Sequence, residues 1–124
     1  MTGKRILVID DDKAVVQYLA LLLRKAGYVI MTAFDPVQAL MQARRDPPDL
    51  ILTDLLMPAG GGYILMERLA SFSQTAGIPI IVLTASDAPD MEARARAVGA
   101  AHIVRKPCDD AILLAVVQES LAAG

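Results

Sequence analysis

The sequence predicts an α/β fold with a doubly wound, five-stranded parallel sheet in which each strand is followed by a helix, (βα)5. Short apolar runs rich in β-branched residues alternate with longer amphipathic stretches, which is typical of βα units. Three of the runs, ILVI, LILT and IPIIVL, are apolar without alternation, as expected for strands that helices cover on both faces. With 124 residues, the chain is the usual size for one domain with one core.

The strands are expected where these apolar runs lie. In chain order they are 5–9, 29–32, 50–53, 78–83 and 102–104. The first, third and fourth should be the central strands of the sheet, because helices must cover both of their faces.

The helices are expected between residues that favour helix starts and residues that favour helix stops. The start signals are Asp12, Asp35-Pro36, Gly60 to Gly62, Asp87 or Pro89, and Asp109. The stop signals are Gly27, Asp46-Pro47-Pro48 and Gly99. The five helices should therefore end near residues 26, 45, 72, 98 and 121.

Composition narrows the classes of function. The net charge is −2 and both signs are mixed along the chain, so we expect no direct binding of nucleic acid. The apolar stretch 14–23 is too short to span a bilayer, and no signal-peptide pattern precedes it, so we expect a cytoplasmic protein without membrane insertion. The single cysteine, Cys108, is interpreted as a packing residue and the single histidine, His102, as ordinary surface.

Polar residues gather at the predicted carboxyl ends of the strands. They are Asp10, Asp11 and Asp12 after the first strand, Asp54 after the third, Thr84 after the fourth, and Arg105 and Lys106 after the fifth. Ligands of open α/β sheets bind at this edge, where the winding direction reverses. We therefore expect the functional site there.

The acids at this edge indicate a divalent metal. Asp10, Asp11 and Asp54 would repel one another unless a cation lies between them, and Mg²⁺ suits carboxylates because it prefers oxygen ligands. Lys106 directly precedes a proline, which favours an extended backbone and lets the ammonium reach a carboxylate or a phosphoryl oxygen. Thr84 offers a hydroxyl donor to the same oxygens.

The motifs ILVIDDD, DLILTDLLMP, PIIVLTA and RKP, in this order and spacing, resemble those of response regulator receiver domains of bacterial two-component systems. The resemblance extends over the whole chain and implies one chemotaxis-regulator-like receiver domain at 1–124, with the flavodoxin-like strand order 2-1-3-4-5. It implies a signalling protein of a phosphorelay that a histidine kinase or phosphotransfer protein phosphorylates. Such a protein catalyses phosphoryl transfer to and from itself and is not a conventional enzyme.

The resemblance also assigns roles to individual residues. It implies that Asp54 is the nucleophile and phospho-acceptor. It implies that Mg²⁺ is bound by Asp11, Asp54 and the backbone carbonyl of Leu56, and by Asp10 through a bound water. Thr84 and Lys106 would hold the phosphoryl oxygens. In this family the face formed by the fourth helix, fifth strand and fifth helix often changes conformation and serves output or dimerisation. A homodimer and a downstream protein partner, which the sequence does not identify, are therefore open expectations.

The sequence departs from the family pattern beside the expected site. Ile103 stands where the family often has a tyrosine or phenylalanine that rotates together with the threonine, so the switch formed by Thr84 and Ile103 would have to repack instead. Three glycines, 60 to 62, give the loop after Asp54 unusual freedom. Leu56 and Ser86 occupy positions that usually tune hydrolysis, and we expect the bulky Leu56 to slow the approach of water.

Other functions stay open from the sequence alone. The acids from Asp10 to Asp12 also fit the Asp-x-Asp pattern of haloacid-dehalogenase-type phosphatases, with Asp10 as nucleophile, although the chain lacks a cap insertion and a later acidic pair. A flavin carrier fits less well, because acids stand in place of a Ser/Thr/Gly phosphate loop. A receiver-like binding module that signals without phosphorylation is supported only by the changes at Ile103 and Gly61.

Overall fold

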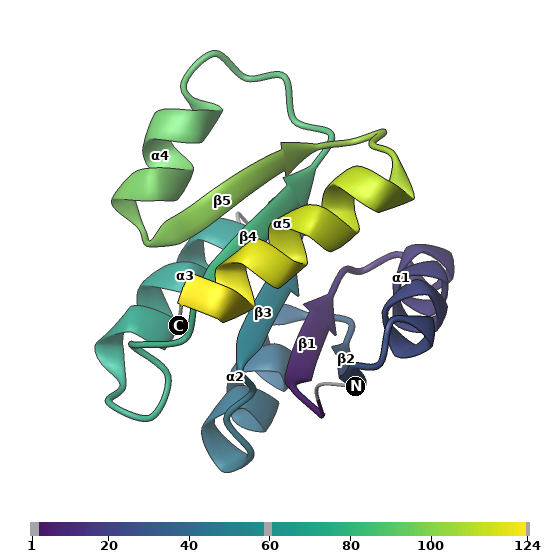
Figure 1. Cartoon of the computed structure of the whole chain (residues 1–124). Helices are drawn as coiled ribbons and strands as arrows, with labels where there is room; N and C mark the ends of the chain where they lie inside the picture. The colour runs from purple at the N-terminus through teal and green to yellow at the C-terminus, as the bar shows by residue number, and fades with distance from the viewer. Residues whose placement is uncertain (1–2, 59–60, 124) are drawn as a thin grey trace.

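Helices cover both faces of a parallel five-stranded sheet, which gives three layers (Figure 1). The computed structural model describes residues 3–58 and 61–123. The strands are β1 (Arg5–Ile9), β2 (Val29–Ala33), β3 (Leu50–Thr53), β4 (Ile80–Thr84) and β5 (Ala100–Arg105). The helices are α1 (Lys13–Lys25), α2 (Pro36–Arg45), α3 (Gly61–Ser71), α4 (Met91–Ala97) and α5 (Asp110–Ala123). The strand order β2-β1-β3-β4-β5 confirms the predicted fold class.

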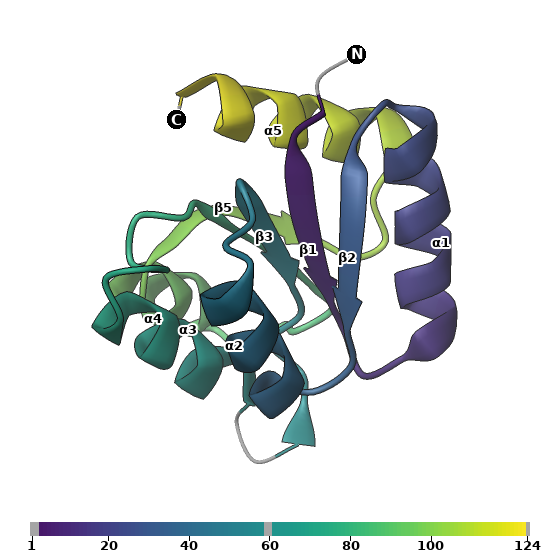
Figure 2. The same ribbon diagram turned by 90° about the horizontal axis from the view of Figure 1, so that it is seen from below.

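The core consists of two apolar layers, one on each side of the sheet. Figure 2 shows α2, α3 and α4 on one side and α1 and α5 on the other. Alternate residues of β1 serve the two layers, since Leu7 and Ile9 pack toward α2 to α4 while Ile6 and Val8 pack toward α1 and α5. Each central strand is buried on both faces, which explains why its sequence is continuously apolar.

The predicted boundaries of the first two helices are correct to within one residue. Asp12 caps α1 by accepting hydrogen bonds from the N–H groups of Ala14 (2.9 Å) and Val15 (3.4 Å). Asp35 caps α2 in the same way, with a bond of 2.7 Å from the N–H of Gln38. These caps fix the directions in which the chain leaves β1 and β2.

The predicted start of the fourth helix was wrong. Neither Asp87 nor Pro89 opens α4, which begins at Met91 after Asp90, and Asp90 makes no side-chain cap bond. The chain from Ala85 to Asp90 instead forms a loop that leads away from the end of β4. The predicted start of the third helix at Gly60 lies outside the described residues.

Two strand boundaries also differ from the prediction. β4 starts at Ile80, because the N–H of Ile78 bonds to the carbonyl of Thr75 (3.1 Å) in a turn and so does not join the sheet. β5 is longer than 102–104, because the turn at Gly99 (φ 110°) brings Ala100 directly into register with Ile80. None of the helices in the described part of the chain has the length and apolar character needed to cross a membrane.

Candidate functional site

Four strands deliver the candidate residues to one edge of the sheet. Main-chain hydrogen bonds continue the sheet pattern just beyond the strand ends. The N–H of Asp54 donates to the carbonyl of Ile9 (3.1 Å), and the N–H of Lys106 donates to the carbonyl of Thr84 (2.8 Å). Because these residues are held by their backbones, the positions of their side chains follow from the register of the strands.

Lys106 joins the two buried carboxylates of the site. Its Nζ donates to Asp10 Oδ2 at 2.9 Å and to Asp54 Oδ2 at 3.4 Å. Asp10 and Asp54 are only 3% and 7% exposed, so each needs such a partner. Burial alone would lower the pKa of Lys106, but its hydrogen bond to Asp10 and the charges of Asp54 and Asp10 outweigh burial and raise that pKa. The lysine is therefore a firmly charged group in this site.

The other oxygen of Asp54 is held by the loop that follows it. Asp54 Oδ1 accepts hydrogen bonds from the N–H groups of Leu55 (2.7 Å) and Leu56 (3.1 Å). α3 packs closely against this loop at Gly62. A Cβ placed on Gly62 would lie 2.5 Å from Leu55 Cα and 2.7 Å from the carbonyl oxygen of Asp54. Both carboxylate oxygens thus have defined partners, which orients the side chain.

Asp11 adds a third acid at the edge of this pair. It is exposed, and partial desolvation, its interaction with Asp10 and the charges of Asp10 and Asp54 together raise its pKa. Three carboxylates share this region with the single ammonium of Lys106. The excess of negative charge is the condition under which a further cation is stabilised.

The donor set fits a hard divalent ion in its chemistry, because every candidate group offers oxygen. In residues 3–58 and 61–123, no three Asp, Glu, His or Cys side chains form an assembled metal-holding group. Asp10 Oδ2 and Asp54 Oδ2 both accept from Lys106, and Asp54 Oδ1 accepts from the loop N–H groups. A metal would therefore share oxygens that Lys106 and the loop already contact.

Thr84 lies next to the site but is bonded to its own loop. It is fully buried, and its Oγ1 accepts a hydrogen bond from the N–H of Ser86 (3.2 Å). Ile103, its expected partner in a switch, is half-buried and packs against the core layer under α2 to α4. Leu56 is 54% exposed beside Asp54.

Sequence reasoning named Arg105 and Gly62 but missed the contacts that these two residues make beside the site. Arg105 donates to the carbonyl of Ser86 at 3.0 Å and to Glu92 Oε1 of α4 at 3.3 Å, so it ties the loop after β4 to α4. Its place at the end of a strand was a signal, but the bond depends on the path of the loop. Gly62 was predicted to be part of a flexible triplet that opens the third helix, whereas the structure shows that it allows α3 to approach the Asp54 loop closely.

Known proteins resemble this chain in sequence and in fold. Residues 6–118 match the family described as the response regulator receiver domain. Response regulator PleD of Caulobacter vibrioides is 38% identical over 114 residues, which are 92% of this chain and 25% of PleD, so the chain spans a quarter of that relative. Protein PilH of Pseudomonas aeruginosa is 30% identical over 118 residues, 95% of this chain and 98% of PilH.

Solved structures give the same result. Chemotaxis protein CheY4 of Vibrio cholerae superposes with a TM-score of 0.90 at 31% identity, covering 97% of this chain and 100% of CheY4. The receiver domain of the sensor histidine kinase PA1611 of Pseudomonas aeruginosa superposes with a TM-score of 0.89 at 26% identity, covering 98% of this chain and 99% of that domain. That second structure is described with a magnesium ion coordinated in its active site cleft.

Proposed function

Since this chain belongs to the response regulator receiver domain family of two-component phosphorelays, we propose that it accepts a phosphoryl group on Asp54 in a Mg²⁺-dependent reaction. The donor is a histidine kinase or a phosphotransfer protein, and the phosphorylated chain signals by changing conformation. One observation carries this proposal. Asp54 is a buried carboxylate at the carboxyl end of β3, with Lys106 on one oxygen and two backbone N–H groups on the other.

The reaction requires an ionised and oriented nucleophile. A carboxylate oxygen of Asp54 attacks the phosphorus in line, and a new O–P bond forms while the bond between phosphorus and the donor's imidazole nitrogen breaks. The electron pair of that bond leaves with the imidazole. Lys106 contacts Asp54 at 3.4 Å and lies where it can neutralise charge on the phosphoryl oxygens. Positioning and electrostatics supply most of the catalysis.

Mg²⁺ would be held by Asp11, Asp54 and the backbone carbonyl of Leu56, with Asp10 acting through a bound water. When bound, it supplies a Lewis acid that neutralises the phosphoryl oxygens. The excess of carboxylates over ammonium groups at this edge supports its binding, and so does the magnesium described for the PA1611 receiver domain. Lys106 and the loop N–H groups would then keep Asp54 oriented.

The conformational change would begin at Thr84. Its hydroxyl would exchange the N–H of Ser86 for a phosphoryl oxygen, the loop after β4 would move inward, and Ile103 would repack behind it. The face formed by α4, β5 and α5 would then bind a downstream partner or a second copy. We place these events in the cytoplasm, where the family's kinases present their phosphoryl groups.

The test is phosphorylation of the purified protein. We expect incubation with Mg²⁺ and acetyl phosphate to add the mass of one phosphoryl group, and beryllofluoride to shift amide resonances near Thr84 and Ile103. Asp54→Asn should abolish both effects, whereas Asp87→Asn, at an exposed acid of the loop after β4, should keep them. Modification that persists in Asp54→Asn would show that another residue, such as Asp10, is the acceptor. No modification and no response to Mg²⁺ would favour a module that signals without phosphorylation.

A further inference from the structure

The face of α2 and α3 that points away from the sheet carries exposed apolar side chains that the proposed phosphorylation does not use. Val37 and Met41 of α2 are 70% and 66% exposed, and Ile64 of α3 is 44% exposed. Val37 and Met41 are four residues apart, so they lie on the same side of the helix. α2 and α3 run side by side on one layer of the protein (Figure 2).

These side chains line one groove instead of being scattered. Val37, Met41 and Ile64 line a cavity of about 400 Å³ between α2 and α3, together with Leu40, Leu65 and Arg68. A second cavity of about 360 Å³ adjoins it through Leu40 and Met41 and extends the groove toward the C-terminal end of α2. Exposed apolar residues that are scattered singly are normal on protein surfaces. Exposed apolar residues that line two adjoining cavities, as here, are typical of a binding surface.

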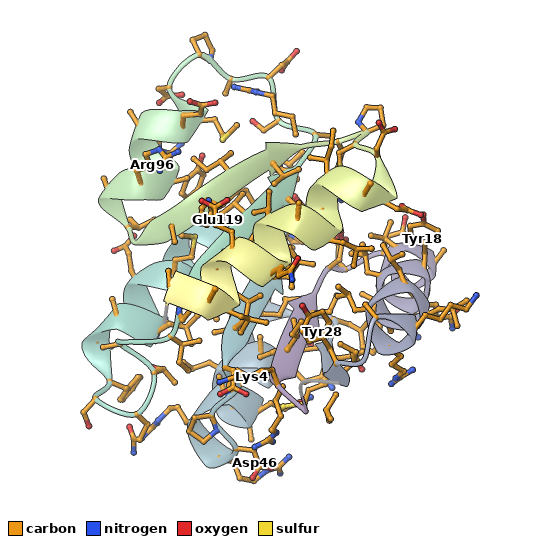
Figure 3. The ribbon with its side chains drawn as sticks, viewed as in Figure 1. Lys4, Tyr18, Tyr28, Asp46, Arg96 and Glu119 are labelled. Carbon is orange, nitrogen blue, oxygen red and sulfur yellow. The ribbon has the colours of Figure 1, made fainter. Side chains whose placement is uncertain are left out.

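The rim of this α2–α3 groove is positively charged, although the whole protein carries a net charge of −2. Arg68 lines the first cavity, and Arg44 and Arg45 line the second. Arg68 makes no ion pair with the described residues. Within residues 3–58 and 61–123, Arg45 pairs only with Asp46 at 3.8 Å, and both side chains are well exposed at the end of α2, where Figure 3 labels Asp46. Such a pair is weak and exchanges readily for a better partner.

The acids near the groove leave this positive charge largely uncompensated. Asp35 keeps its charge as the N-cap of α2, where it accepts a hydrogen bond from the N–H of Gln38, but it lines neither of the two cavities. Glu67 precedes Arg68 on α3 and is exposed, but it does not line either cavity. Arg44 stacks on the ring of Phe72 at 3.8 Å from its centroid, which fixes its guanidinium beside the second cavity. A ligand in the α2–α3 groove would therefore contact apolar side chains in the middle and arginines at the rim.

We propose that the α2–α3 groove binds an amphipathic helix of a partner protein, with apolar residues on one side and carboxylates flanking them. The apolar side would cover Val37, Met41 and Ile64, and the carboxylates would pair with Arg68 and Arg45. Helices bind grooves in this way through residues at i, i+3, i+4 and i+7. This surface is distinct from the α4, β5 and α5 face, so the partner could remain bound through the phosphorylation cycle.

The proposal is tested by selecting helical peptides on the protein. A displayed library of 16-residue peptides would be selected on wild type, and the enriched peptides would then be titrated against Met41→Gln, which changes an exposed residue and so leaves folding intact. We expect the enriched peptides to carry acids and large apolar residues at helical spacing. Their affinity should fall at least tenfold in Met41→Gln, fall severalfold in Arg68→Gln, and weaken with added NaCl. Leu21→Gln, a change of an exposed apolar residue on α1, should leave affinity unchanged.

Several results would overturn the proposal. Enriched peptides that are basic or neutral would remove the role of the arginines, and peptides that shift amide resonances of α1 or α5 would place binding elsewhere. A wild type that self-associates through Met41 would identify a second copy as the occupant. Repeating the selection on Asp54→Asn separates this inference from the proposed function, because binding at the α2–α3 groove should persist without phosphorylation.

Discussion

The ammonium of Lys106 lies 2.9 Å from Asp10, closer than the 3.4 Å that separates it from Asp54. Asp10 thus holds the lysine in place beside Asp54, because its carboxylate is the nearer of the two that the ammonium contacts. The lysine stem is packed enough to be only one-quarter exposed, so its ammonium has few alternative positions. Charge balance in this site depends on Lys106.

Replacing Lys106 by methionine should keep the volume of the stem and remove the charge. Asp10 and Asp54 would then be buried without a cation, and we expect the free energy of unfolding at pH 7 to fall by about 1–3 kcal/mol, less than for a fully buried pair because Lys106 is partly exposed. Urea unfolding measures this change, with Lys25→Met, at an exposed residue of α1, as the control. Equal stability of Lys106→Met and wild type would mean that the ion pairs contribute nothing.

The same ion pairs predict how stability depends on pH. The pKa of Lys106 is raised from 10.5 in the folded protein, so the folded state retains its proton at a higher pH than the unfolded chain does. Its contribution should be complete below about pH 10.5 and should be lost as the pH rises through the raised value. Urea midpoints between pH 9 and pH 12 should therefore converge for wild type and Lys106→Met. A gap that stays constant over this range would contradict the assignment.

The fold was predictable because its signals are local. Asp12 and Asp35 cap helices whichever way the chain packs, and a continuously apolar strand such as β3 indicates cover on both faces. The boundaries near β4 and β5 were less predictable. The first residue of β5 is set by its pairing with β4, and this pairing shifts register between Ile80 and Ile81. Neither segment contains a local sequence signal from which that pairing could be predicted.

The sequence was sufficient to predict which residues of the candidate site lie close together. Parallel strands end at a common edge, so Asp10, Asp54 and Lys106 were expected together and are found in contact. The choice of Lys106 between the two acids was not predictable, because it depends on differences of less than 1 Å. The bond from Arg105 to Ser86 was missed for a similar reason, since it crosses from a strand to an irregular loop.

Gly62→Ala should disturb the loop that follows Asp54 directly. The added Cβ would lie 2.5 Å from the backbone of Leu55, and backbone cannot move aside as a side chain does. We expect a loss of about 1–3 kcal/mol in the free energy of unfolding and slower phosphorylation of Asp54 by acetyl phosphate. Gly77→Ala, where a Cβ would meet nothing within 4 Å, is the control. If both variants behave alike, α3 does not constrain the loop.

Arg105→Ala should release the loop after β4 from α4. The variant loses the hydrogen bond to the Ser86 carbonyl and the ion pair with Glu92. Because both interactions lie at the exposed surface, we expect the free energy of unfolding to change by less than about 1 kcal/mol. Amide hydrogen exchange at Ser86 and Ala88 should nevertheless become faster. Arg96→Ala, which removes a weak bond of 3.5 Å to the carbonyl of Ala101, should leave this exchange unchanged. Unchanged exchange in Arg105→Ala would show that the loop holds its own conformation.

Leu56→Ala should shorten the life of the phosphorylated protein. Leu56 is 54% exposed in the loop that holds Asp54, and we expect its side chain to slow the approach of water to a phosphoryl group on Asp54. Removing most of that side chain should speed hydrolysis about three- to tenfold, equivalent to about 0.6–1.4 kcal/mol in the barrier. Stability should hardly change, since the residue is exposed. Loss of phosphoprotein followed by mass spectrometry measures the rate, with Ile112→Ala, a similarly exposed residue on α5, as the control. A half-life equal to or longer than that of wild type would show that Leu56 does not limit the approach of water.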